Sequence, residues 1–178
     1  MTGTGRALAA LAIGAACGAG FPLGDRGDPR AAETPIVRVE PGTSSPRTGA
    51  TFTVAVKIRH AHDTGSVPFT LVYDPRILEF VASGSVEGGF LSKDGSPTSF
   101  LAAPAPHGGG LRAVVVGLSR LRSDKGVGGK GTLCKLTFRA RAPGVSPLVF
   151  SRASVLDPAA LPVAADFRGG SITVRPAP

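Results

Sequence analysis

Aromatic side chains are scarce in this sequence of 178 residues, which has no tryptophan and one tyrosine, Tyr73. Flat aromatic rings offer large apolar faces, and sugar-binding β-sandwiches usually stack pyranose rings on them. Most of the nine phenylalanines fall at apparent core positions. The composition therefore argues against an aromatic sugar-binding platform, although recognition of a carbohydrate in a polar cleft stays open.

The residues needed for catalysis are also missing. Asp and Glu together number 12, and we find no pair of facing carboxyl groups of the kind that a glycosidase requires. No nucleophile elbow and no complete phosphate-binding loop occurs. His60, His62 and Asp63 cluster at a strand end, but without a further ligand at metal-binding spacing a solvated turn is the favoured interpretation. We therefore predict a protein that is not an enzyme and has no metal or cofactor.

Only two cysteines occur, Cys17 and Cys134. An unpaired thiol in an exported protein can be reactive. However, Cys134 alternates with Leu136 and Phe138 on one face of a predicted strand, where a thiol behaves as a small apolar group. We therefore predict that Cys134 lies in the core.

The N-terminus has the features of an export signal over residues 1–17. Arg6 precedes the uncharged apolar run 7–16, which fits the hydrophobic region of a signal and is too short to span a bilayer as a helix. Small residues precede Cys17, as in lipoprotein signals, although Gly14 stands where leucine is usual. Acylation of Cys17 and plain signal cleavage therefore both stay open. Either predicts an exported protein, which is periplasmic, an outer-membrane lipoprotein or extracellular.

Residues 18–35 are rich in glycine, proline and charge without periodicity, which predicts a flexible linker. The remaining residues, 36–175, suffice for one domain with its own core. The sequence has 25 glycines and 16 prolines and no helical apolar stripe, which favours short strands joined by turns.

The formal net charge is +8, from 20 Lys and Arg against 12 Asp and Glu. Such a balance suits acidic partners. The basic residues are nevertheless dispersed and are not interleaved with aromatic residues, so no nucleic-acid partner is predicted. A solvated outer face is the favoured interpretation, and membrane contact is expected only through a lipid anchor at Cys17.

Strict alternation is clearest over residues 51–59, where Phe52, Val54, Val56 and Ile58 share one face. This period of two predicts a strand with one face in a core and one in water. Further strands are predicted at 36–40, 67–73, 78–80, 111–119, 132–142, 148–150, 155–156 and 170–174, with loops at 84–110 and 123–131. About nine short strands predict an all-β fold, a two-sheet antiparallel β-sandwich of jelly-roll type.

Tyr73, Asp74 and Pro75 form a predicted structural corner between two strands. Pro75 lacks an N–H and ends the first strand, and the Asp74 carboxylate can accept N–H groups freed at the turn. This corner, its flanking strands and the late strands 131–140 and 169–174 together resemble the cohesin domain family over residues 36–175. The resemblance implies a β-sandwich that binds protein partners and performs no chemistry. Cellulose-binding modules share this sandwich, so the superfamily is wider than the family.

The resemblance also implies a partner. Cohesins bind dockerins, which are small calcium-loaded helical modules of polysaccharide-degrading complexes. The family's docking face includes a polar and an acidic residue just before the strand that leads to the corner. Ser66 and Pro68 occupy these positions here, and Pro68 supplies neither a carboxylate nor an N–H.

Alternation suggests which side chains would form a docking face. If the odd-numbered residues of 67–73 face the core, the even-numbered residues face outward and adjoin the next apolar strand. The candidate partner-binding residues are Ser66, Pro68, Thr70, Val72, Val114 and Val116. Whether this apolar patch is exposed as a partner site or is covered by the loop 84–110 stays open. We predict a cohesin-like scaffolding or anchoring module of an exported assembly linked to polysaccharide degradation, with a carbohydrate-binding module as the alternative.

Overall fold

The computed structural model describes residues 33–121 and 124–178, and these form strands, turns and loops. Nine strands have five or more residues: β1 (Ile36–Glu40), β3 (Thr51–Thr64), β4 (Phe69–Tyr73), β5 (Leu78–Glu87), β6 (Thr98–Pro106), β7 (Arg112–Arg120), β8 (Val127–Ala140), β9 (Gly144–Ala153) and β13 (Gly170–Val174). Four are shorter: β2 (Thr43–Ser44), β10 (Val155–Leu156), β11 (Pro162–Val163) and β12 (Asp166–Arg168). None of the described segments is a helix that could cross a lipid bilayer.

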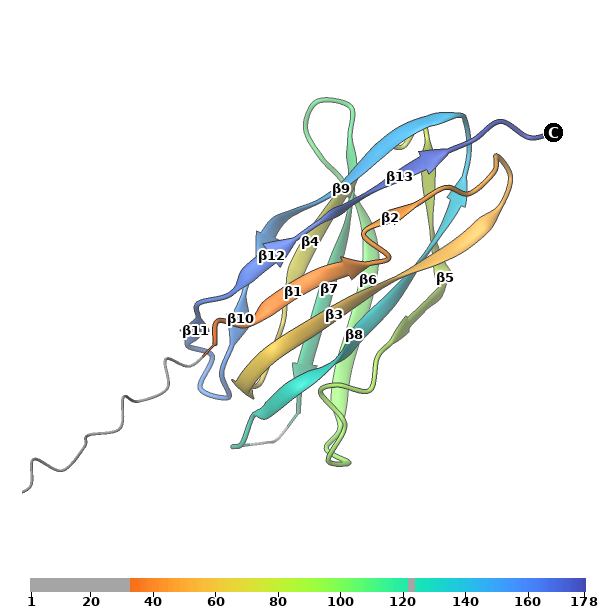
Figure 1. Cartoon of the computed structure of the whole chain (residues 1–178). Helices are drawn as coiled ribbons and strands as arrows, with labels where there is room; N and C mark the ends of the chain where they lie inside the picture. The colour runs from red at the N-terminus through yellow and green to blue at the C-terminus, as the bar shows by residue number, and fades with distance from the viewer. Residues whose placement is uncertain (1–32, 122–123) are drawn as a thin grey trace, which may run out of the picture. The chain divides into compact units, whose positions relative to one another are not determined.

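Two sheets face each other as a sandwich (Figure 1). The first sheet has the order β12-β1-β3-β8-β5, and the second has the order β2-β13-β9-β4-β7-β6. Their long strands pair antiparallel, whereas the short edge strands β12 and β2 run parallel to β1 and β13. β10 and β11 form a separate small hairpin. The predicted all-β, two-sheet sandwich is confirmed.

The core between the sheets comes from the alternating residues. Val54, Val56 and Ile58 are fully buried on β3, as the period-two pattern predicts. Phe138 on β8 is fully buried too, and its ring lies 5.4 Å from that of Tyr73, edge to face. Cys134 is buried as predicted, and burial raises the pKa of its thiol to about 12.

Both predicted loops contain strand. Within 84–110, β5 continues to Glu87 and β6 occupies Thr98–Pro106. Within 123–131, β8 begins at Val127. Proline, alanine and glycine have little preference for strands. β6 and the start of β8 become strands by pairing with β7 and β3, and the end of β5 pairs with β8. The loop predictions are therefore wrong in these parts.

The large apolar residues of the first of these segments behave differently from one another. Phe90 and Leu91 are buried in the core. Phe100 is partly buried and packs against the core. Leu101 is mostly exposed, because β6 is a strand in which neighbouring side chains point to opposite faces.

The predicted export signal, including Cys17, and most of the predicted linker 18–35 lie outside the described residues. These boundaries remain predictions. All thirteen strands fall within residues 36–174, inside the predicted domain 36–175.

Candidate partner-binding face

The corner after β4 is built around the Asp74 carboxylate. Asp74 Oδ1 accepts the N–H of Arg76 at 2.9 Å, and the Arg76 guanidinium donates to both carboxylate oxygens. This side-chain hydrogen bond lowers the pKa of Asp74. The N–H of Asp74 donates to Ser146 Oγ at 3.0 Å, which ties the corner to β9. Tyr73, Asp74 and Pro75 thus fix where β4 ends and contribute to the fold.

The pairing of β4 with β7 decides which residues face outward. Phe69 lies opposite Val116, and Leu71 lies opposite Val114. Residues directly opposite in an antiparallel pair point to the same side of the sheet, and both β4 residues are buried in the core. Val114 and Val116, at 0% and 1% exposure, therefore also face the core.

The prediction that Val114 and Val116 lie on an outer face is thus wrong by one position. Residues 113–116 are all apolar, so there is no alternation of apolar and polar residues to indicate which side chains of this strand face the core. A shift of one residue moves every side chain to the other face. The outward residues of β7 are Ala113 and Val115, which lie opposite Val72 and Thr70.

The other predicted residues lie on or beside the outer face. Thr70 is half-buried on it, and Val72 is almost buried at its centre. Pro68 is partly exposed just before β4. The hydroxyl of Ser66 lies 2.8 Å from Ser119 Oγ and donates to the Leu118 carbonyl, so it is engaged within the fold.

Neighbouring strands extend this outer surface. Val72 lies opposite Val149 on one side and Ala113 on the other, and Ala113 lies opposite Ala105. We call the whole surface the apolar face and define it by Thr70, Val72, Leu101, Ala103, Ala105, Ala113, Val115 and Val149. Its most exposed apolar side chains are those of Leu101 (61%), Val149 (50%) and Val115 (39%).

Sequence reasoning missed these three residues. Val149 has a usable signal, because it lies between Leu148 and Phe150 in the predicted strand 148–150, where alternation places it on the opposite face from both. Leu101 had none, since its strand was predicted as a loop.

Two shallow hollows lie along the apolar face. One, of about 230 Å³, is lined by Thr70, Ala105, Pro106, His107, Ala113, Val115, Ser151 and Arg152. The other, of about 190 Å³, also touches Thr70, Val115 and Arg152 and reaches Pro68. The face is therefore hollowed along β4, where side chains of a partner can seat.

The two sheets differ in the charge of their outer surfaces. The strands of the second sheet contain three arginines and no acidic residue. Of these, Arg152 lies opposite the outward-facing Thr70. Arg112 and Arg120 share the inward phase of Val114 and Val116, and the Arg120 side chain is almost buried. The first sheet carries both signs, and its Glu40 carboxylate forms ion pairs with several cations, Lys57 among them. The hydrogen bond from Lys57 lowers the pKa of Glu40. Because charge is depleted in the centre of protein interfaces, the second sheet is the better docking surface.

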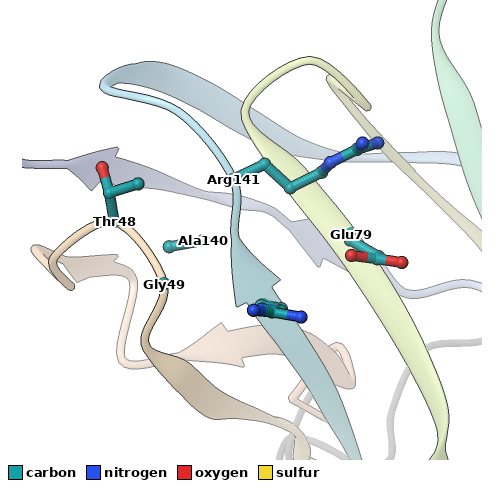
Figure 2. A pocket seen from close by; sticks show the side chains of 6 residues that line it. Thr48, Gly49, Glu79, Ala140 and Arg141 are labelled. Atoms are coloured by element: carbon teal, nitrogen blue, oxygen red, sulfur yellow. The ribbon is translucent and has the colours of Figure 1, made fainter.

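A further pocket, of about 340 Å³, lies where the turn before β3 meets β5 and β8. Its lining residues are Thr48, Gly49, Glu79, Arg139, Ala140 and Arg141. Figure 2 shows Glu79 and Arg141 extending on the side away from Thr48. Glu79 is the single carboxylate among these lining residues, and a glycosidase needs two that face each other. We assign no chemistry to this pocket.

Within the described residues, no three His, Cys, Asp or Glu side chains are placed so that they could hold a metal ion, those of the histidine cluster on β3 included. Asp63 Oδ1 instead accepts the N–H of Gly126 at 2.8 Å. This bond joins the end of β3 to the segment that leads into β8.

A family model described as the cohesin domain matches residues 37–174. No curated protein matches the chain.

Solved structures match over most of the chain. A non-cellulosomal cohesin from Archaeoglobus fulgidus is 20% identical, with a TM-score of 0.61, and the match covers 80% of this chain and 91% of that one. A chain of a type I cohesin–dockerin complex from Clostridium thermocellum is 16% identical, with a TM-score of 0.62 and coverage of 81% and 95%. A Clostridium acetobutylicum protein solved in solution is 21% identical, with a TM-score of 0.60 and coverage of 80% and 92%. At these identities the likeness shows the fold.

Proposed function

The chain belongs to the cohesin domain family, and from that membership we propose that it binds a dockerin-type protein partner through the apolar face. The family is one of non-catalytic protein-interaction modules. The finer proposal is that this module scaffolds or anchors an exported assembly that acts on polysaccharide.

One observation carries the proposal, namely that the apolar face presents exposed apolar side chains around a buried centre and is almost uncharged. Burial of apolar surface contributes roughly 25 cal/mol per Å², and a stable interface buries about 800 Å² on each partner. Leu101, Val115 and Val149 present such surface on three adjacent strands. The match to a chain of a cohesin–dockerin complex supports a dockerin as the partner.

The composition of the face also indicates how recognition would differ within the family. Pro68 stands where the family has a residue that can form polar contacts, and Ser66 is hydrogen-bonded within the fold. Binding would therefore rest on apolar packing, with orientation set by Arg152 near the end of β9, which lies opposite Thr70. A partner with acidic side chains around an apolar centre fits this arrangement.

The test is titration with purified, calcium-loaded dockerin modules from the same genome, followed by calorimetry. Val149→Asp should raise the Kd by about 100-fold, since it places a carboxylate in a desolvated contact. Val86→Asp is the matched control, because Val86 is 51% exposed on the first sheet, and it should leave the Kd unchanged. Leu101→Asp on the apolar face and Leu161→Asp outside it form a second test and control pair, since both leucines are 61% exposed.

Either of two results would contradict the proposal. One is the absence of binding to any such module at micromolar concentrations. The other is equal weakening by both members of a matched pair, since that would mean a general effect of the added charge.

The alternative of a carbohydrate-binding module is not favoured by any observation on the apolar face. None of the aromatic residues in the described part of the chain falls among the exposed residues, so sugar rings have no platform to stack on. Export, with or without a lipid at Cys17, remains part of the proposal. Mass spectrometry of the mature N-terminus tests it, since an unprocessed Met1 would contradict export by a cleaved signal.

A further inference from the structure

A second surface with unusual chemistry lies at the end of the first sheet where β3 finishes and β8 begins (Figure 1). The pairing of these strands is irregular here. Ile58 lies opposite Gly131, and Ala61 lies opposite Gly129, so two residues of β3 oppose one residue of β8. Such a bulge re-aims side chains and is common beside functional sites.

The bulge turns two consecutive side chains to the same side. Ile58 and Ala61 are buried, whereas both Arg59 and His60 between them are exposed. His60 has a φ of 53°, in the left-handed region that few residues with a side chain adopt. Regular alternation would have sent one of these two side chains into the core. Lys130 lies on the opposing strand between the two paired positions and is exposed as well.

These three side chains surround a pocket of about 430 Å³ lined by Arg59, His60, Gly129 and Lys130. Gly129 has a φ of 97° and no side chain, so a ligand can approach the backbone there. A Cβ built on Gly129 would lie 3.9 Å from Lys93 Nζ. Lys93 Nζ therefore lies beside Gly129, although Lys93 does not line the pocket, and it is held by a hydrogen bond to the Gly128 carbonyl and by the Phe90 ring.

The nearby carboxylates compensate only part of this charge. Glu33 pairs with His60, and Glu40, already paired with Arg38 and Lys57, lies 3.8 Å from Arg59. Among the described residues, no carboxylate forms an ion pair with Lys93 or Lys130. The pocket thus has an excess of positive charge and no acidic lining residue.

Positive charge continues from the pocket across the sheet. Lys57 lies two residues from Arg59 on the same face, Arg38 lies opposite Lys57, and Arg168 lies opposite Arg38. Glu40 pairs with Arg38 and Lys57 and lies 3.8 Å from Arg59. Asp166 pairs with Arg168 at 3.5 Å. Two carboxylates thus face four cations, so the row keeps a net positive charge, which favours an anionic ligand.

We propose that this pocket and the adjoining row of cations bind an acidic polysaccharide. Arg59 and Lys130 hold one carboxylate, sulfate or phosphate group of the chain in the pocket, and Lys57 and Arg38 contact the next groups along it. The guanidinium fork of arginine suits such planar or tetrahedral oxyanions. The row favours a linear polymer over a single ion.

Other polyanions fit less well. Nucleic-acid strands are usually bound by cations together with aromatic side chains on which bases stack, and no described aromatic residue is exposed. Peripheral membrane binding combines cations with apolar side chains that insert into the interface, and no apolar residue lines the pocket. The binding does not depend on a dockerin partner, which would use the opposite face.

The test uses the full mature chain and polygalacturonate, a linear polymer of carboxylates, with neutral dextran of similar length as control. The wild-type protein should bind polygalacturonate in a salt-dependent manner and should not bind dextran. The double variant Arg59→Ala/Lys130→Ala should raise the Kd about 10-fold or more. Arg141→Ala/Arg175→Ala, which removes the same charge from exposed sites at the other end of the sandwich, should change it less than twofold.

Circular dichroism and melting temperature verify that the variants fold. Lys130→Ala alone is the fallback, since that exposed side chain has no ion pair among the described residues, and it should weaken binding about 3-fold or more. Equal losses in the two double variants would show that net charge alone acts and would overturn the site. Tighter binding to phosphatidylglycerol vesicles or to a single-stranded oligonucleotide would overturn the choice of an acidic polysaccharide.

Discussion

At the scale of single residues, Asp74 is the clearest contributor to stability. Its carboxylate is almost fully buried and accepts hydrogen bonds from the Arg76 backbone and guanidinium. Arg76 itself is largely exposed, so solvent screens its charge. The hydrogen bond from the Arg76 N–H to the Asp74 carboxylate is therefore the main contribution of Asp74 to stability. This hydrogen bond holds the turn between β4 and β5.

We expect Asp74→Ala to lower the free energy of unfolding at pH 7 by about 1 kcal/mol, since it leaves the Arg76 N–H at this part-buried turn without its acceptor. The pKa of Asp74 is lowered in the fold, so its contribution is complete above the unfolded pKa of about 4. The contribution is lost as the pH falls through the lower, folded pKa. Urea unfolding at pH 7 and near pH 2 should show the variant approaching the wild type in acid.

The control for this experiment is Asp166→Ala, whose exposed ion pair with Arg168 should contribute less than about 0.5 kcal/mol. A difference between Asp74→Ala and the wild type that persists undiminished in acid would contradict the assignment. It would show that packing at the corner, and not the ionised carboxylate, is what the variant loses.

At the scale of elements, the edge strand β6 shows how the sheet avoids uncontrolled pairing. Among the described strands, β6 pairs only with β7. The Pro97 carbonyl accepts Leu121 N–H, and His107 N–H donates to the Leu111 carbonyl, so the odd-numbered backbone groups face β7. The N–H positions of Pro104 and Pro106 therefore fall on the open edge, where proline has no donor to offer.

We expect Pro104→Thr/Pro106→Thr to promote self-association, because it adds two donors to an exposed edge that another strand can use. Light scattering coupled to size-exclusion chromatography over a range of concentrations should show a larger mass for the variant. Pro143→Thr, in the exposed turn between β8 and β9, is the control and should stay like the wild type. A double variant of unchanged mass at every concentration would mean that something else protects this edge.

Elements differ in how far their sequence predicts their structure. β3 carried a clear period of two, and its buried face was predicted correctly as far as Ile58. The alternation is interrupted at the bulge, which depends on pairing with the glycines of β8. The sequence therefore predicts a turn at the cluster around His60, where the structure has a strand.

β7 is apolar at four successive positions, so its sequence does not indicate which side chains face the core. For this reason the predicted docking face included Val114 and Val116 in error. The sequence of β6 has no strand pattern of its own, because this segment becomes a strand through its pairing with β7. Local pattern thus predicted the sandwich, while the outer faces depended on contacts between distant segments.

At the scale of the whole domain, the sandwich separates two kinds of surface. The outer face of the second sheet is apolar, and the outer face of the first sheet is charged. Packed sheets lie about 10 Å apart with the core between them, so a ligand on one outer face does not touch the other. An apolar contact depends weakly on salt, whereas the binding of a polyanion weakens steeply as salt rises.

We therefore expect the two ligands to bind at the same time and to respond differently to salt. The Kd for a dockerin module should change less than twofold when polygalacturonate saturates the domain. Raising the salt from low to physiological concentration should weaken polygalacturonate binding several-fold and leave dockerin binding almost unchanged.

Val149→Asp should remove dockerin binding only, and Arg59→Ala/Lys130→Ala should remove polygalacturonate binding only. Competition between the ligands would mean that they share a surface, and loss of both interactions in one variant would mean that the substitution disturbs the fold. A domain that holds both at once would keep a protein partner beside an acidic polymer.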